Sequence, residues 1–413
     1  MLTNKRKASW ILFFLCASAY ITVWIAKTAL AASMVGIVSE GFFTKSQLGI
    51  VNGSYFIFYG GGQLLGGRIT DKISPYKMIV IAICGAILSL FGIAISRNFT
   101  FMLIIWSIGG LLEFGIWPST MRIISQYILP EHKSKAMFYI GFASCVGTIF
   151  SYLCASIILD RYSWRILFLV YMIILTCMLC VWIIWARKTL IVLKNGELSE
   201  HKEKNETNED DTSDFNFGKL FVVSGLFILL LPTFIRQTLS ALNTWVPTMI
   251  KEVYGIASGA ASILNIILSV VNLGGVLLVN FLYPKRIRNI IVVYFLCFVS
   301  MIPFTLMLMF TGKISVFIVL ILLCGVTTMA YSASQCVNVV IPTYFAKYNC
   351  TGRVAAMINA LGSFGSVAAN IGFGFLSDNI GWTGTIISWS ILALVGSIFT
   401  LITIPVWKRF SEK

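Results

Sequence analysis

The sequence has 413 residues, of which 58% are hydrophobic and only 11% are charged, with a mean hydropathy of +0.88. This composition excludes an ordinary soluble enzyme, in which about a quarter of residues are charged. The net charge of +15 could suggest a nucleic-acid-binding protein, but the basic residues cluster between apolar runs instead of forming a continuous stripe. The class that remains is a polytopic membrane protein.

Twelve apolar runs follow one another along the chain. A helix needs about 20 mostly apolar residues to cross a bilayer, and a strand with period-two alternation would not stay apolar for that length. We therefore predict an all-α membrane protein with twelve transmembrane helices. The runs cover residues 10–34, 47–67, 78–96, 100–121, 136–159, 165–186, 220–249, 258–283, 289–311, 314–343, 354–376 and 383–407.

A polar segment divides the runs into six and six. Eight of the sixteen acidic residues lie between Glu197 and Asp214, a composition typical of a solvated linker. We predict an N-terminal six-helix bundle over residues 1–187, an acidic cytoplasmic linker over 188–218 and a C-terminal six-helix bundle over 219–413. A regulatory or metal-binding role for the acidic segment is an alternative.

The two predicted halves share a spaced set of residues. Asp160 and Trp164 recur as Asp378 and Trp382, each 218 positions later. Two facing six-helix repeats are typical of secondary transporters, in which the substrate site lies near the midplane between the repeats.

The basic residues also predict the orientation of the chain in the membrane. Of the 31 Lys and Arg residues, 23 fall on the side of both termini and six in the loops of the other side. The side richer in Lys and Arg is normally cytoplasmic. We expect an integral protein of the plasma (bacterial inner) membrane with both termini in the cytoplasm.

The last two basic residues, Lys27 and Arg236, lie inside predicted helices at matching places in the two halves. A cation near the bilayer centre costs about 2.5 to 3.5 kcal/mol on insertion scales. Two such costs at related positions predict a shared anion that both groups bind. Alternatively, each cation extends to the membrane surface or pairs with a carboxylate, for which Glu113 is the obvious partner.

Other candidate site residues surround these cations. Tyr20, Trp24 and Lys27 are spaced by four and three, so they share one face of a helix. Glu113 lies four residues before Trp117, and its carboxylate is either a counter-ion or a carrier of the coupling proton. We also assign Gln237 and Asn243 to orientation of the substrate.

Taken over essentially the whole chain, these features resemble the major facilitator superfamily. Residues 67–72, Gly-Arg-Ile-Thr-Asp-Lys, resemble its signature loop between the second and third helices. The resemblance implies a gating role for Gly67, Asp71 and Lys72.

Within this superfamily the sequence resembles the organophosphate:phosphate antiporters. Residues 115–118, Gly-Ile-Trp-Pro, look like the fourth-helix pattern of that branch, and residues 162–165, Tyr-Ser-Trp-Arg, resemble its connection between helices five and six. The resemblance implies that Tyr20, Lys27 and Arg236 are ligands of a substrate phosphate.

The sequence departs from that branch at four candidate positions. Lys27 stands where the antiporters usually carry arginine, and Arg236 lies about one helical turn further from Pro247 than the spacing of that family. Glu113 replaces a glutamine, and Ser144 replaces the histidine of a glycerol-phosphate transporter. An added carboxylate lowers the expected cavity charge from +2 to +1, because Lys27 and Arg236 give two positive charges and Glu113 one negative. This change also favours a proton-coupled carboxylate symporter.

We predict a secondary transporter, and not an enzyme, that moves a small organic anion by alternating access. A phosphate ester exchanged for inorganic phosphate is the first candidate; a carboxylate carried with a proton and a transporter-like sensor of sugar phosphates are alternatives. We expect no cofactor, no metal, no nucleic acid partner and a monomer in the lipid bilayer. The two histidines, His132 and His201, lie in predicted loops and cannot build a zinc site.

Overall fold

The computed structural model describes residues 2–65, 72–197, 217–348 and 350–411. In this part of the chain ten helical segments are long and apolar enough to span a membrane. Helices α2 (Lys45–Leu65) and α8 (Ala143–Ile158) pack among them and bring the number to twelve. The predicted all-α fold with twelve membrane helices is confirmed.

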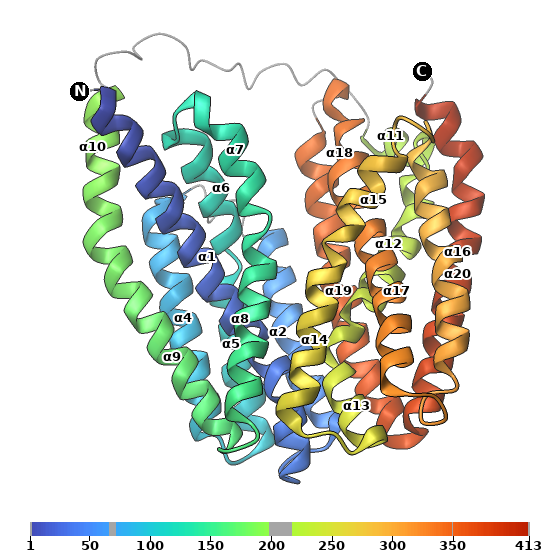
Figure 1. The fold of residues 1–413 in the computed structure, drawn as a ribbon. Coiled ribbons are helices and arrows are strands. Elements are labelled where there is room, and N and C mark those ends of the chain that lie inside the picture. Colours follow the sequence, from blue (N-terminus) through green and yellow to red (C-terminus); the bar gives the residue numbers. More distant parts are fainter. Residues whose placement is uncertain (1, 66–71, 198–216, 349, 412–413) are drawn as a thin grey trace.

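Figure 1 shows the helices in two groups that follow the order of the chain. Besides α2 and α8, the first group contains α1 (Leu2–Ser39), α4 (Pro75–Ile95), α5 (Phe99–Glu113), α6 (Ile116–Tyr127), α7 (Pro130–Ile140), α9 (Trp164–Val181) and α10 (Arg187–Glu197). The second group contains α11 (Phe217–Val223), α12 (Leu226–Ser240), α13 (Val246–Tyr254), α14 (Ser258–Asn272), α15 (Gly274–Leu282), α16 (Ile290–Leu308), α17 (Val316–Gln335), α18 (Ile341–Thr343), α19 (Thr351–Asn379) and α20 (Gly381–Ser411).

Several predicted boundaries differ from the structure, among them those of the run at 220–249 and of the linker. The single run at 220–249 is three helices, because Gly225 adopts a left-handed φ of +74° between α11 and α12, and a 3₁₀ turn over Ala241–Thr244 separates α12 from α13. Helix α10 continues through Arg187–Glu197, into residues that the composition assigned to the linker. The remainder of that segment, 198–216, lies outside the described residues.

The outer surface of the two groups is apolar. Large hydrophobic side chains such as Phe317 and Leu277 are 73% and 71% exposed. A soluble protein rarely exposes so many large apolar residues, whereas a membrane protein presents them to lipid. The polar residues that are buried lie inside and between the helix groups, and this arrangement positions the candidate site.

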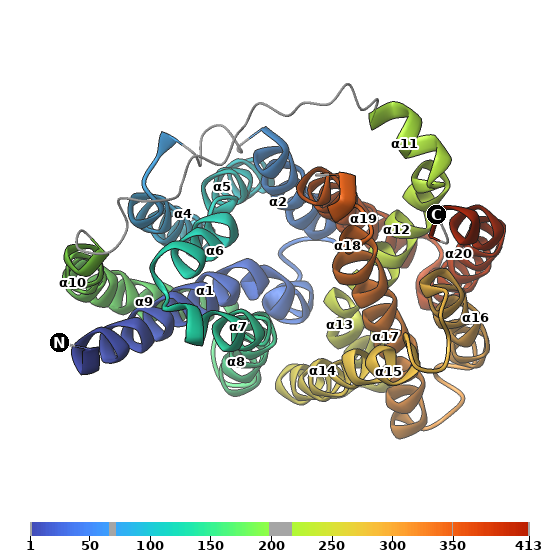
Figure 2. The ribbon, with the colours of Figure 1, turned by 90° about the horizontal axis from the view of Figure 1, so that it is seen from above.

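The two groups meet along two helix pairs, α2 with α19 and α8 with α14 (Figure 2). Glycines permit the close approach of α2 and α19. A Cβ atom added to Gly49 would lie 2.2 Å from the carbonyl oxygen of Asn370, and one added to Gly374 would lie 2.7 Å from that of Lys45. Small residues at such contacts are typical of helix packing in membranes.

This contact predicts opposite effects for one substitution at two positions of α2. In Gly49→Ala the new methyl group pushes α2 away from the backbone of α19. We expect this to lower the free energy of unfolding by about 1–3 kcal/mol. Gly61→Ala is the matched control, because no atom lies within 4 Å of its added Cβ; the lower backbone entropy of alanine is expected to stabilise it by about 0.5–1 kcal/mol. Thermal unfolding in detergent measures both, and equal shifts would contradict the close contact.

Candidate functional site

A cavity of about 690 Å³ lies between the two helix groups. On α2 its lining runs from Asn52 to Gln63, and on α19 from Ala355 to Asn370. The side chains of Asn52 and Asn370 form its floor, because the Asn52 amide donates a 2.7 Å hydrogen bond to Asn370 Oδ1 across the two groups. On the side away from the chain termini, Gly49 and Gly374 allow α2 and α19 to lie in direct contact.

The cavity receives one cation from each helix group. Lys27 reaches it from α1 and Arg236 from α12. The structure therefore brings together the two intramembrane cations that the sequence assigned to a common anion.

The Arg236 guanidinium is deeply buried and lacks a compensating partner. Its side chain is 1% exposed, and its Nε atom has no hydrogen-bond partner among the described residues. Within the same part of the chain no carboxylate lies within 4.0 Å of it. A buried cation without a counter-charge is costly, and a guanidinium offers paired donors that match a phosphate or carboxylate.

Lys27 is surrounded by aromatic rings instead of by acids. Its Nζ lies 3.8 Å from the ring centre of Tyr59, 4.6 Å from that of Trp24 and 5.5 Å from that of Phe56. Attraction to the negative faces of aromatic rings stabilises the ammonium without neutralising its charge. Lys27 thus presents its ammonium group at the cavity wall with aromatic rings, and no carboxylate of the described chain, in contact with it.

Most of the other predicted site residues also line the cavity. Tyr20, Trp24 and Trp117 contribute from the first group, and Gln237 and Asn243 from the second. The Tyr20 ring contacts both tryptophans, at centroid distances of 5.7 Å and 5.1 Å.

Ser144 does not belong to the cavity lining. Thr148, one helical turn further along α8, lines the cavity in its place and accepts a 2.8 Å hydrogen bond from Trp24 Nε1. The sequence placed the polar side chain one turn too early, because the rotation of α8 depends on its packing against α1.

Glu113 is not part of the cavity lining and makes no ion pair with a cation among the described residues, whereas its alternative role as carrier of the coupling proton stays a prediction. Its side chain is 1% exposed, and Oε2 accepts a 2.6 Å hydrogen bond from the Tyr55 hydroxyl. No ion pair within 4.0 Å joins it to Lys27 or Arg236 among the described residues. The lowering of the cavity charge from +2 to +1 that the sequence predicted therefore has no ion pair of Glu113 behind it.

Three prolines interrupt helices where they meet the cavity. A proline removes the hydrogen bond to the carbonyl four residues earlier and clashes with that carbonyl. Pro118 accordingly follows the break between α5 and α6, Pro247 follows the 3₁₀ turn after α12, and Pro342 follows a π-helical turn after α17. Irregular backbone at membrane depth is tolerated where it lines a cavity.

The walls contributed by the two groups differ in chemistry. The first group supplies every aromatic residue of the lining, whereas the second supplies no aromatic residue and six of the eight carboxamides. The aromatic residues are Tyr20, Trp24, Phe56, Tyr59, Trp117 and Tyr152. The carboxamides of the second group are Gln237, Asn243, Asn265, Asn338, Asn359 and Asn370. The sequence analysis missed most of these residues because single polar residues in apolar helices carry no signal of which way they face.

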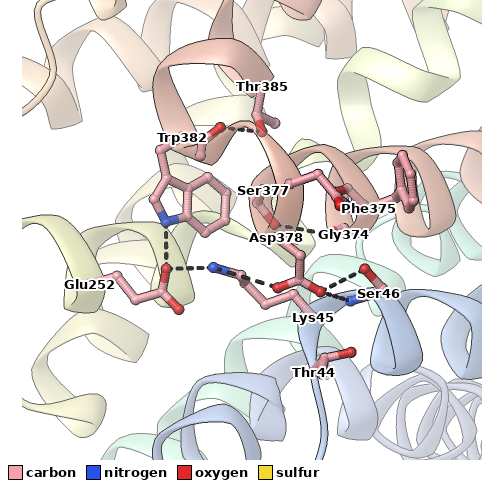
Figure 3. A network of polar contacts seen from close by, with 12 residues as sticks. Thr44, Lys45, Ser46, Glu252, Gly374, Phe375, Ser377, Asp378, Trp382 and Thr385 are labelled. Atoms are coloured by element: carbon pink, nitrogen blue, oxygen red, sulfur yellow. Dashed lines mark hydrogen bonds and ion pairs between the residues drawn. The ribbon is translucent and has the colours of Figure 1, made fainter.

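A polar network closes the molecule at the end opposite the termini (Figure 3). Lys45 Nζ lies 2.8 Å from Glu252 Oε2 and 3.8 Å from Asp378 Oδ1. Asp378 Oδ2 accepts 2.6 Å hydrogen bonds from the backbone N–H and the hydroxyl of Ser46, and Trp382 Nε1 donates a 2.7 Å bond to Glu252. These contacts join α2 of the first group to α13, α19 and α20 of the second.

A second carboxylate acts in the same way on the other helix pair. Asp160 follows α8, and its Oδ1 accepts a 2.7 Å hydrogen bond from the backbone N–H of Gly259 in the first turn of α14. In the same way, Asp378 of the second group binds the first turn of α2 in the first group through Ser46. The recurrence of aspartate at an offset of 218 thus corresponds to two carboxylates, each of which caps a helix of the opposite group; a carboxylate there complements the exposed N–H groups and the helix dipole.

The proposed signature loop is only partly described. Gly67 and Asp71 lie outside the described residues. Lys72 is exposed to solvent at the start of the segment that leads to α4.

Comparisons with known proteins give relatives that are named as transport proteins. The chain is 25% identical over 249 residues to the human voltage-gated purine nucleotide uniporter SLC17A9, covering 54% of this chain and 55% of that protein. It is 20% identical over 167 residues to a probable hexose phosphate transport protein of Chlamydia trachomatis, covering 40% of this chain and 36% of that protein. The matched segments thus span about half or less of these curated relatives.

Solved structures share the fold over nearly the whole chain. A D-xylose-proton symporter superposes with a TM-score of 0.73 at 16% identity, covering 95% of this chain and 96% of the other. A bacterial homologue of the human lysosomal transporter Spinster, in an inward-facing and occupied conformation, gives 0.71 at 14% identity, with coverage of 98% and 97%. The family model of the Major Facilitator Superfamily matches residues 10–370, and the chain belongs to this superfamily.

Proposed function

We propose that this transporter moves a small organic anion across the membrane by alternating access. The observation that carries the proposal is the buried guanidinium of Arg236, which faces the central cavity without a counter-charge. Lys27 reaches the same cavity from the opposite helix group. An anion bound between them would offset the cost of both cations and would draw the two groups together.

A phosphate ester exchanged for inorganic phosphate is the substrate class that we favour. The cavity supplies the planar guanidinium of Arg236 and the ammonium of Lys27. These are the two kinds of cation that bind phosphate oxygens in proteins. The similarity to a probable hexose phosphate transport protein is in keeping with this choice. A proton-coupled carboxylate symporter is the second candidate, because Glu113 is a buried carboxylate with one oxygen, Oε1, that lacks a hydrogen-bond partner within the described chain.

In this proposal the two helix caps form the gate on the closed side. Asp160 and Asp378 hold the first turns of α14 and α2, so both bonds must break before the cavity can open there. With both termini in the cytoplasm of a plasma-membrane protein, as the basic residues predict, this gate lies on the outer side of the membrane.

Uptake into proteoliposomes tests the anion site. We expect inward movement of at least one of glucose 6-phosphate, glycerol 3-phosphate, inorganic phosphate and succinate, with phosphate counterflow if exchange is the mechanism. Arg236→Ala is expected to lower kcat/KM at least about 30-fold, because truncating a buried group that binds a charge costs about 2 kcal/mol or more. Arg236→Lys is expected to recover part of the loss, since lysine keeps the positive charge but lacks the paired donors of the guanidinium.

Lys27→Ala is expected to weaken uptake through a higher KM for the same anion. Lys313→Ala is the matched control, because Lys313 is exposed in the loop between α16 and α17. Unchanged uptake by both Lys27→Ala and Arg236→Ala would refute the anion site. Binding of an anion without any flux would instead identify a sensor, and accumulation of succinate with protons would identify the symporter.

The two caps predict which segments become mobile when the gate is weakened. Loss of a capping carboxylate costs about 0.5–2 kcal/mol, so Asp378→Ala is expected to accelerate amide hydrogen exchange about 2- to 30-fold in the first turn of α2, which contains Ser46. Asp160→Ala is expected to do the same in the first turn of α14. Asn379→Ala is the control, since the side-chain amide of Asn379 donates a 2.8 Å hydrogen bond to the Phe375 carbonyl within α19. Equal exchange in all three variants would contradict the gate.

A further inference from the structure

The ammonium of Lys27 has a setting that the proposed anion site alone does not explain. Among the described residues no carboxylate lies within 4.0 Å of it, yet three rings surround it. Tyr59 is the nearest, with its ring centre 3.8 Å from Nζ. A lysine side chain has many rotamers, so a fixed position at the cavity wall requires something to hold it.

The ring of Tyr59 is itself held from behind. It stacks on the ring of Tyr55 at a centroid distance of 5.8 Å and an interplanar angle of 12°. Tyr55 is fully buried, and its hydroxyl donates a 2.6 Å hydrogen bond to Glu113. Tyr59 and Tyr55 are four residues apart on α2, so one helix face presents both rings.

The contact with Lys27 uses the ring of Tyr59 and not its hydroxyl. The hydrogen bonds of the described chain include none made by the Tyr59 hydroxyl, although Tyr59 is only 6% exposed. A ring attracts a cation through its quadrupole and leaves the positive charge intact, whereas a carboxylate in the same place would compete with an anionic substrate.

We propose that Tyr59 is a positioning residue for anion binding, which holds the Lys27 ammonium at the cavity wall in the absence of a carboxylate. Tyr55 and Glu113 act one step further away, because Tyr55 stacks on the ring of Tyr59 and donates its hydrogen bond to Glu113. This inference rests on the proposed anion site. It assigns to Glu113 a role behind the cavity wall instead of one as counter-ion.

Three substitutions at position 59 separate the ring from the hydroxyl. The probe is the best-transported anion among glucose 6-phosphate, glycerol 3-phosphate, inorganic phosphate and succinate. Tyr59→Leu removes the ring and is expected to raise KM about 2- to 30-fold with little change in kcat, in line with the strength of a cation–π contact. Tyr59→Phe and Tyr59→Trp keep an aromatic face and are expected to stay within about twofold of the wild-type KM. A Tyr59→Phe variant as weak as Tyr59→Leu would overturn the inference, because the hydroxyl would then be the active group.

A double-mutant cycle distinguishes positioning from general packing. If Tyr59 acts through Lys27, Tyr59→Leu is expected to have no further effect on KM in a Lys27→Ala background. Additive effects would show that the ring acts independently of Lys27 and would overturn the inference while the anion site stands. If Lys27→Ala itself leaves KM unchanged, the proposed anion site fails, so the two failures are distinguishable.

Discussion

The structure depends on one electrostatic constraint, a guanidinium buried between membrane helices with no counter-charge beside it in the described chain. Arg236 is 1% exposed, and a charge in such a place is retained at a cost of several kcal/mol. Lys27 meets the same constraint differently, since aromatic rings hold it. Because both cations face one cavity from opposite helix groups, the proposed anion would offset the cost of both and would link the two groups.

Helix α2 connects the separate parts of this arrangement. Gly49 brings it against α19, and Asn52 forms the cavity floor with Asn370. One turn beyond, Tyr55 binds the buried carboxylate of Glu113, and the next turn places a ring under the cavity lysine. The same helix begins with the turn that Asp378 caps from the opposite group.

Apolar length predicted the helices because every backbone group in a membrane must be satisfied within its own segment. Helical periodicity also grouped Tyr20, Trp24 and Lys27 at the cavity. The partner of Glu113 could not be predicted, because Tyr55 is 58 residues away and meets it only through the packing of α2 on α5. Likewise, the recurring aspartates were visible in the sequence, but their capping role depends on contacts between the two helix groups.

The position of a bound oxyanion tests the central claim most directly. Tungstate has the shape and charge of a phosphate-like oxyanion and scatters strongly enough to be located by anomalous diffraction from crystals of the protein. The account predicts a tungsten peak in the central cavity with contacts to Arg236 and Lys27, and loss of that peak in Arg236→Ala. Tungsten bound only outside the cavity, with both side chains free of it, would contradict the account.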